Sequence, residues 1–336
     1  MNDVMNITIC GGGNLGHVCA GFLGVENNVS LLTTRPERWA SEVKVTDLNG
    51  KMYSGRIQEK SSRPEDVIPE ADLVLICLPG YAIHDVLLQI APYVKPSAWV
   101  GTVVSSTGFF FEAMDLLPRH QTLFGFQRVP FIARTTEYGH SAALKGYKES
   151  LRVAVEQTAD KEQVRRTLEQ LFCTPVVLLD SFYEVSLSNS NPLLHTSRLY
   201  TLWHDWKPGM VYEYNPFFYA DWTTETSELF IKMDDEFQIL LKVLGLKEGA
   251  VPSVLNYYES HDAESLTRKL CSIPAFQGLK SPMKAVENGW VPDFSSRYFT
   301  EDFPYGLRFI YESAHQRHLN CPCIDAVYEW GMQCLA

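Results

Sequence analysis

The sequence lacks any long run of lysine or arginine, and its 336 residues carry a net charge of −11. Nucleic-acid-binding proteins need a basic face for the phosphate backbone, so this class is excluded. No uninterrupted apolar run reaches the roughly 18 residues of a membrane-crossing helix, and no charged leader precedes an apolar signal core. We expect a soluble, cytoplasmic protein whose partners are small molecules, not nucleic acid or a membrane.

Zinc-type cysteine spacing is also missing, although the chain has eight cysteines. Cys321 and Cys323 follow His315 and His318, but a Cys-x-Cys pair around proline is poor spacing for zinc. Both histidines fall on an expected helix. Several other cysteines lie in apolar, strand-like runs, where thiols serve as small core residues. We expect reduced thiols and no metal site.

The chain contains no internal repeat and no low-complexity linker, yet its length and 46% apolar content suit two domains. The expected fold class is α/β, with an N-terminal Rossmann-type dinucleotide-binding domain over residues 1–180. A mainly α-helical substrate and catalytic domain should follow over 181–336, because long helical patterns replace strand patterns there. We expect the active site between the two. A homodimer is left open.

A glycine turn between an apolar strand and a helix is the most informative feature. Gly11, Gly13 and Gly16 form a GxGxxG motif. In a βα unit the first glycine permits the tight turn, the second lets backbone N–H groups approach a pyrophosphate, and the third lets the helix pack closely. The phosphates then face the helix N-terminus, beside Asn14 and Leu15. We expect a bound nicotinamide dinucleotide; a merely structural turn is the alternative.

The end of the second strand, expected over 29–33, bears on which cofactor is used. An NAD enzyme usually has Asp or Glu there for the ribose 2′-hydroxyl, whereas a 2′-phosphate is bound by hydroxyls and a guanidinium. Here the strand runs into Thr34 and Arg35, with Arg38 close behind. NADP is therefore expected over NAD, although both arginines could simply be solvated.

Other segments of the first domain follow the same logic. Two buried parallel strands should end at Leu78-Pro79 and at Ser105, bordering the cofactor. The remaining expected elements are a structural β-hairpin over 43–57, β-rich runs over 122–134 and 151–156, and a helix over 161–172.

Two segments of the second domain carry side chains suited to proton transfer and anion binding. Asn191 and His195 are four residues apart, so on a helix they share a face. Histidine transfers protons well near neutral pH, but a lone histidine is often structural. The second segment, residues 284–307, contains Arg297 and Asp302 between proline and glycine residues; it suits either a rigid functional loop or a surface ion-pair cluster.

At these two segments the chain resembles the octopine (opine) dehydrogenase family. The family has a helical histidine in an Asn-x-x-x-His pattern and a loop similar to residues 292–306. The likeness extends to the segments 78–82, 105–108, 129–139 and 278–282, and so spans most of the chain.

The resemblance implies a reductive condensation, in which an amino acid and a 2-keto acid form an imine that NAD(P)H reduces, or the reverse oxidation. It implies that His195 is the general acid/base, that Asp302 orients and charges the imidazole, and that Arg297 holds the keto-acid carboxylate. Asn191 would position His195 or a polar group of the substrate.

One segment departs from the octopine-forming members, which use acidic groups to recognise a guanidinium. This chain has Gln127 and Arg128 there. A cation beside a cationic substrate is unfavourable, so arginine is not the expected amine, unless Arg128 pairs with a surface acid.

Two other functions stay open. A hydroxy-acid or polyol-phosphate reductase of the same two-domain group would use a lysine, and Lys280 and Lys284 are available. A non-catalytic NADP-sensing protein would need neither His195 nor Asp302.

Overall fold

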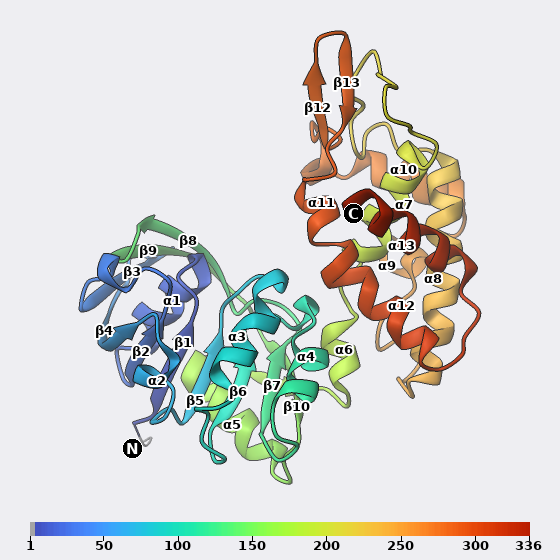
Figure 1. The fold of residues 1–336 in the computed structure, drawn as a ribbon. Coiled ribbons are helices and arrows are strands. Elements are labelled where there is room, and N and C mark those ends of the chain that lie inside the picture. Colours follow the sequence, from blue (N-terminus) through green and yellow to red (C-terminus); the bar gives the residue numbers. More distant parts are fainter. Residues whose placement is uncertain (1–3) are drawn as a thin grey trace. The chain divides into compact units, whose positions relative to one another are not determined.

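The computed structural model describes residues 4–336 and divides the chain into two compact units, the first ending at Ser186 and the second formed by Leu187–Ala336. The first unit is a sheet with helices, and the second is mainly helical (Figure 1). The α/β fold class expected from the sequence is confirmed. The units divide six residues after the expected position of 180, because a short helix, α6, belongs to the first unit.

The first unit alternates strands and helices. Its strands are β1 (Asn6–Cys10), β2 (Asn28–Leu32), β3 (Glu42–Asp47), β4 (Met52–Ser61), β5 (Leu73–Ile76), β6 (Trp99–Thr102), β7 (Leu123–Phe126), β8 (Phe131–Glu137), β9 (Ser141–Tyr147), β10 (Leu151–Glu156) and β11 (Val176–Leu178). Its helices are α1 (Asn14–Leu23), α2 (Pro64–Val67), α3 (Ile83–Ile90), α4 (Phe109–Leu116), α5 (Lys161–Phe172) and α6 (Phe182–Ser186).

The strand order is β11-β10-β7-β6-β5-β1-β2-β4-β3-β9-β8. Strand β1 pairs in parallel with β2 on one side and with β5 on the other. The chain therefore leaves β1 in one direction across the sheet and later returns to its other side. In such sheets ligands bind beyond the carboxyl ends of the strands at this reversal, which is where the glycine turn lies.

Alternation along β5 shows how the sheet is covered on both faces. All four of its residues are buried, as a parallel strand between two layers requires. Leu73 and Leu75 belong to the core cluster that includes α1 and α5, whereas Val74 and Ile76 belong to the one that includes α3 and α4. Because successive side chains point to opposite faces, these clusters are the two layers around the sheet.

Several expected elements of the first unit are present, with two differences. Helix α5 has the expected bounds, and β3 and β4 form the expected antiparallel hairpin. However, β4 also pairs in parallel with β2, so the hairpin continues the main sheet. The single run expected over 122–134 is two strands, because the chain turns near Pro130, and strand β9 was not predicted. Small residues in β9 gave a weak strand pattern.

The second unit has the helices α7 (Asn191–Trp203), α8 (Thr224–Val243), α9 (Val254–Tyr257), α10 (Ala263–Ser272), α11 (Arg297–Thr300), α12 (Arg308–His315) and α13 (Pro322–Leu335), and the strands β12 (Met283–Val286) and β13 (Gly289–Pro292). The strands form an antiparallel hairpin that extends beyond the helices of this unit (Figure 1). Contrary to expectation, His318 lies outside a helix, since α12 ends at His315.

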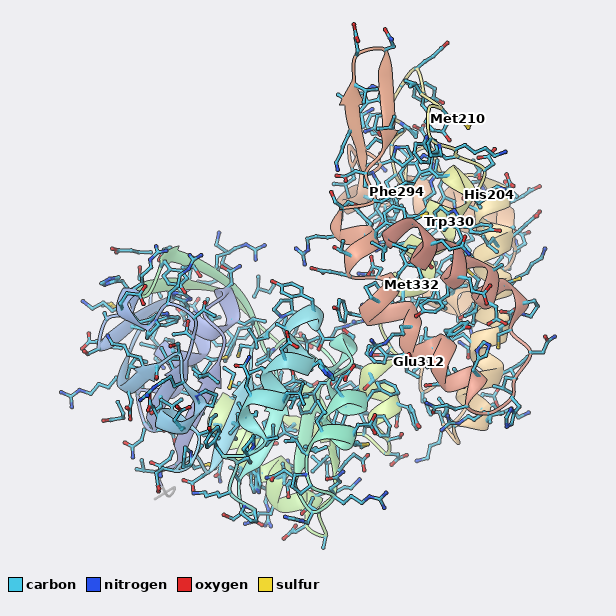
Figure 2. The ribbon with its side chains drawn as sticks, viewed as in Figure 1. His204, Met210, Phe294, Glu312, Trp330 and Met332 are labelled. Atoms are coloured by element: carbon cyan, nitrogen blue, oxygen red, sulfur yellow. The ribbon has the colours of Figure 1, made fainter. Side chains whose placement is uncertain are left out.

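Helix α8 forms much of the core of the second unit. Met233, Phe237 and Leu240 recur at helical spacing and are buried, as their pattern predicts. A cluster of aromatic side chains surrounds Phe299, which packs against Phe294, Phe303 and Trp330. Figure 2 labels Phe294 and Trp330, which reach this group from different segments of the unit. In residues 4–336 we find no helix both long and apolar enough to cross a membrane.

Candidate active site

The glycine turn after β1 has a geometry that side chains would not tolerate. Gly11 has φ 122°, donates its N–H to the carbonyl of Leu32 at 3.0 Å, and would bring an added Cβ within 2.7 Å of the Cys77 carbonyl oxygen. A Cβ on Gly16 would lie 2.1 Å from the Gly11 carbonyl oxygen. Both glycines are therefore needed for the turn and for the close start of α1.

Gly13 differs from the other two glycines of the motif. It is exposed, its φ of −85° suits any residue, and an added Cβ would meet no atom within 4 Å. It is the N-cap of α1, and no side chain caps this helix start. The first N–H groups of a helix need an acceptor, so this open space suits an anion such as a pyrophosphate.

A pocket of about 450 Å³ continues from this turn within the first unit. Among its lining residues are several that the sequence analysis assigned to the cofactor: Gly11, Thr34, Arg35 and Leu78. The other assigned residues do not line this pocket. Gly16 and Ser105 are buried, and Leu15 packs against the core. Asn14 accepts a hydrogen bond from the Thr135 N–H at 2.8 Å, and Pro79 precedes a 3₁₀ turn. Arg38 lines a neighbouring hollow.

Tyr138 is a wall of the pocket that the sequence analysis did not single out. It lies between β8 and β9, and the guanidinium of Arg38 lies over its ring at 4.5 Å. Its hydroxyl would lie 2.7 Å from a Cβ on Gly12, so it closes over the glycine turn. Nothing in the sequence near Tyr138 links it to the glycine motif; only the pairing of β9 with β3 brings it there.

His17, buried beneath the turn, fixes this arrangement. Its Nε2 accepts the Gly139 N–H at 2.7 Å, so Nδ1 carries the proton and donates to the Gly13 carbonyl at 2.8 Å. Burial lowers the pKa of His17, partly opposed by the bond to Gly13, so the ring is neutral near pH 7. Trp39 stacks on it at 4.1 Å. His17 therefore ties the turn beside Tyr138 to the glycine motif.

In the second unit, α7 carries the histidine expected to transfer protons. Pro192 in the first turn suits a helix start, since its missing N–H would have no partner there. The His195 side chain is 12% exposed and its Nδ1 lies 2.7 Å from Oδ2 of Asp302, although 107 residues separate them. An ionised Asp302 accepts from Nδ1–H, which leaves Nε2 as the nitrogen with a lone pair.

Asp302 stands immediately before a π-helical segment, Phe303–Leu307. The N–H of Leu307 donates to the Asp302 carbonyl at 2.7 Å, five residues back. Such segments are rare and occur frequently at functional sites. The segment packs against α7, which brings the carboxylate to the imidazole.

Aromatic rings enclose the imidazole. Nε2 lies 2.9 Å from the hydroxyl of Tyr219, and the ring of Tyr298 meets the imidazole edge-on at 4.8 Å. Phe218 lies at 5.7 Å. Residues 200–222 are rich in aromatic side chains, but the sequence did not predict a contact with His195, because no local spacing links residue 219 to 195.

Arg198 holds the loop that carries these rings. It lies one turn beyond His195 on α7, is 2% exposed, and donates to the carbonyls of Phe217, Phe218 and Asp221. Burial lowers the pKa of Arg198 to about 10, partly opposed by Asp221, so the guanidinium stays charged at neutral pH. One helix therefore positions both the imidazole and the loop beside it.

The remaining expected substrate residues do not join this cluster in the described residues. Asn191 is exposed at the start of α7, where its backbone N–H donates to Asn189 Oδ1. Arg297 forms a two-pronged ion pair with Glu301, with both bonds at 2.8 Å. Gln127 and Arg128 belong to the first unit.

The lysines considered as alternative catalysts have other contacts. Lys280 donates to the Asn215 carbonyl at 3.0 Å and its Nζ lies 3.7 Å from the ring centre of Phe217. Lys284 pairs with Asp293 at 2.8 Å. Over residues 4–336, we find no group of three or more His, Cys, Asp and Glu side chains placed to hold a metal.

Comparison with known proteins assigns a family to each part of the chain. Residues 178–335 match the family described as NAD/NADP octopine/nopaline dehydrogenase, alpha-helical domain. Residues 7–137 match ketopantoate reductase PanE/ApbA. These matches follow the division between a sheet unit and a helical unit.

Full-length similarities agree with the family match. The opine dehydrogenase of Haliotis discus hannai is 27% identical over 368 residues, covering 98% of this chain and 90% of that protein. The tauropine dehydrogenase of Arabella iricolor is 28% identical, covering 97% of this chain and 90% of that protein.

Solved structures show the same fold. Octopine dehydrogenase with NADH and L-arginine superposes with a TM-score of 0.82 at 26% identity, covering 98% of this chain and 89% of that one. A yersinopine dehydrogenase with NADP⁺ bound shares the fold, with a TM-score of 0.71 at 14% identity, covering 100% of this chain and 92% of that one. The glycine turn, the NAD/NADP named in the matched helical family and the NADH bound to octopine dehydrogenase agree on a nicotinamide dinucleotide as cofactor. The helical part of the chain matches the octopine/nopaline dehydrogenase family, and nearly the whole chain is similar to opine, tauropine and octopine dehydrogenases, which are NAD(P)-dependent oxidoreductases acting on CH–NH groups.

Proposed function

We propose that this protein joins the amino group of an amino acid to a 2-keto acid, using NAD(P)H, or oxidises the product in reverse. The observation that carries the proposal is the contact between Nδ1 of His195 and the Asp302 carboxylate, which equips the imidazole to take and return a proton. The family assignment supplies the reaction class.

In the condensing direction, His195 would carry out two proton transfers. The substrate ammonium must lose a proton before its nitrogen can attack the keto carbon, and the resulting hydroxyl must gain one to leave as water. The Tyr219 hydroxyl bonds Nε2, so it would pass the first proton from the ammonium to Nε2 and later pass it back to the leaving hydroxyl, while Asp302 stabilises the imidazolium between the two steps. The imine that forms is then reduced at carbon. The bound cofactor supplies that hydride.

The glycine turn and the pocket beside it would hold the cofactor. The uncapped start of α1 at Gly13 would bind the pyrophosphate, and the pocket wall at Thr34 and Arg35 would bind the ribose end. We propose a preference for NADP, because β2 ends without a carboxylate and Arg35 lines the pocket. Arg38, stacked on Tyr138, would contribute less.

Arg297 is the proposed anchor for the keto-acid carboxylate, since a guanidinium binds carboxylates with two parallel bonds. Glu301 accepts from its Nε and Nη2 in this structure, so the substrate carboxylate would share or replace that partner. Asn191 and Gln127 are proposed to bind polar substrate groups. The side chain of Arg297 is 83% exposed, which leaves it accessible to a small anion.

The amine substrate is proposed to be a neutral or acidic amino acid, or another polar amine. Arg128 is an exposed cation next to Gln127 at the end of β7, where a cationic substrate would be repelled. Octopine dehydrogenase has been solved with L-arginine and with agmatine, both cations, so this chain would differ in amine choice.

A two-way screen tests the proposed function. Amino acids are paired with pyruvate, glyoxylate and 2-oxoglutarate, with NADPH and NADH in parallel, and products are identified by mass. We expect NADPH oxidation coupled to one secondary amine per cofactor, with arginine a poor amine. Oxidation that needs a keto acid but no amine would instead indicate a hydroxy-acid reductase.

A further inference from the structure

Tyr219 hydrogen-bonds the nitrogen of His195 that Asp302 does not. Its hydroxyl oxygen lies 2.9 Å from Nε2, while Oδ2 of Asp302 lies 2.7 Å from Nδ1. The geometry points to Tyr219 as the group that fixes the tautomer and orientation of the His195 imidazole and connects its Nε2 to the substrate. This inference rests on the proposed role of His195 as the acid/base.

The donors and acceptors of Asp302, His195 and Tyr219 determine where the protons lie in this hydrogen-bonded series. An ionised Asp302 only accepts, so Nδ1 of His195 carries the proton of the neutral ring. Nε2 then has a lone pair, and the Tyr219 O–H donates to it. When Nε2 becomes protonated, the same hydroxyl turns and accepts, because a phenol can do either. Tyr219 therefore partners the imidazole in both of its states.

The hydroxyl can serve this way only if it keeps its own proton. Tyr219 is 3% exposed, and burial raises its pKa far above the usual value, with nearby Asp302 adding to the effect. The phenol is therefore neutral at every pH at which a histidine titrates. Tyr219 does not compete with the imidazole for the proton.

The ring of Tyr219 is held rigidly enough to direct its hydroxyl. Phe276 stacks on it with a centroid distance of 4.0 Å and an angle of 14° between planes, and Trp222 is almost parallel at 6.1 Å. Arg198 binds the backbone on both sides of residue 219, at Phe218 and Asp221. The hydroxyl thus has a fixed position relative to α7.

An imidazole bonded at both nitrogens cannot flip about its Cβ–Cγ bond without breaking two hydrogen bonds. Without the Tyr219 hydroxyl, the bond to Asp302 and the rings of Tyr298 and Phe218 would still contact the imidazole, but the hydrogen bond that holds Nε2 would be lost. Small errors in the position of a reacting group can cost about 100-fold in rate. We therefore expect loss of the hydroxyl to act on turnover and not on cofactor binding.

Tyr219→Phe tests this, with Tyr200→Phe as the matched control. Tyr200 lies on the same helix as His195, is half-buried and stacks on His204, whereas the Tyr219 hydroxyl bonds Nε2. In ¹⁵N-labelled protein, the chain's nine histidines are resolved by NMR and His195 is assigned from the signal lost in His195→Gln. We expect the Nε2 resonance to move towards that of an unbonded lone pair in Tyr219→Phe and to stay in Tyr200→Phe.

Kinetics complete the test. We expect kcat to fall about 10- to 100-fold in Tyr219→Phe, with the KM for NADPH unchanged, and to stay within about threefold in Tyr200→Phe. An unmoved Nε2 signal in Tyr219→Phe, or equal losses of kcat in both variants, would overturn the inference. If the wild type turns over no amine and keto-acid pair, the proposed function fails, whereas the NMR comparison still decides whether Tyr219 sets the state of the imidazole.

Should Tyr219→Phe melt at a much lower temperature than the wild type, Phe276→Leu replaces it. This change keeps the hydroxyl but removes the stacked ring that directs it. We expect a smaller displacement of the same NMR signal and a smaller loss of kcat. No displacement in a folded Phe276→Leu would contradict the account of how Tyr219 is held.

Discussion

The two units build their sites in different ways. In the first, the backbone of one short segment, Gly11 to Gly16, forms the turn proposed to bind the pyrophosphate, and added side chains would obstruct it at both ends. In the second, side chains from residues 195, 219 and 302 meet through the packing of α7, a loop and a π-helical segment. A site made of local backbone tolerates little change in its glycines, whereas a site made of distant side chains depends on their chemistry.

The largest expected effect is loss of the proton-transferring side chain. His195→Gln should lower kcat by about 10²- to 10⁴-fold, the usual contribution of general acid–base catalysis. The Kd for NADPH should not change, because the cofactor site is assigned to the first unit. Stopped-flow turnover and fluorescence titration measure the two quantities.

His204→Gln provides the control for that variant. His204, labelled in Figure 2, follows the last turn of the same helix and is exposed, and its ring stacks on Tyr200. It should retain turnover within about twofold. Equal losses in both variants would mean that α7, not the imidazole at 195, matters for activity.

The glycines of the first unit should separate binding from stability. Gly13→Ala should leave the melting temperature of the free protein unchanged, since the added Cβ meets open space and φ is ordinary. It should weaken NADPH binding about 10- to 100-fold, the equivalent of losing a hydrogen bond to a charged group. Isothermal titration and thermal melting measure both.

Gly16→Ala, in contrast, should destabilise the free protein. Its Cβ would lie 2.1 Å from the Gly11 carbonyl oxygen, so the fold must shift, at a cost of about 1–3 kcal/mol in unfolding free energy. If Gly13→Ala destabilised the free protein as much as Gly16→Ala, the distinction between an open cradle and a packed contact would fail.

The preference for NADPH over NADH tests the proposed role of the arginines in the first unit. Arg35→Ala should lower the preference for NADPH over NADH about 10-fold, because a guanidinium on a phosphate contributes about 1.5–3 kcal/mol. Arg38→Ala should change it less, since Arg38 lies over Tyr138. The ratio of kcat/KM for the two cofactors is the measurement. An unchanged ratio in Arg35→Ala would point to NAD.

The smallest expected effect concerns stability of the second unit. Burial raises the pKa of Asp234 to about 6, although bonds from the Val254 N–H and from Gln238 oppose the rise. Since the folded pKa lies above the unfolded value of about 3.9, folding binds a proton between the two, so stability falls as pH rises from about 4 through 6. Asp234→Asn should remove this slope, a difference of about 1–3 kcal/mol at pH 7.

Urea unfolding of wild type and Asp234→Asn at several pH values measures that difference. His17 in the first unit gives the opposite sign, because burial lowers its pKa and so folding excludes a proton below about pH 6.5. In the wild type, His17 should make the free energy of unfolding rise with pH, and this contribution should be absent in His17→Gln. The same sign for both residues would contradict the burial argument.

The sequence predicted most of the first unit because its signals are local. A glycine motif after an apolar run, continuous apolar strands and an amphipathic helix over 161–172 each need only neighbouring residues. Strand β9 escaped prediction because small residues weaken its alternation. Tyr138 escaped because it joins the pocket only through pairing of distant strands.

In the second unit, local patterns alone left the proposed catalytic pair, His195 and Asp302, undecided. The helix around His195 was expected, but its partner Asp302, 107 residues away, came from a family resemblance and not from any spacing. Tyr219 was missed because an aromatic-rich stretch more often forms core, as Trp203, Phe218 and Trp222 do here. Side chains that meet through tertiary packing leave no periodic pattern to detect.

A double-variant cycle on His195 and Asp302 tests the central claim most directly. If the carboxylate acts through the imidazole, His195→Gln, Asp302→Asn and the double variant should share almost the same reduced kcat, because a pair that acts as one unit is not additive. Losses that multiply in the double variant would show that the two residues act independently, and would contradict the account.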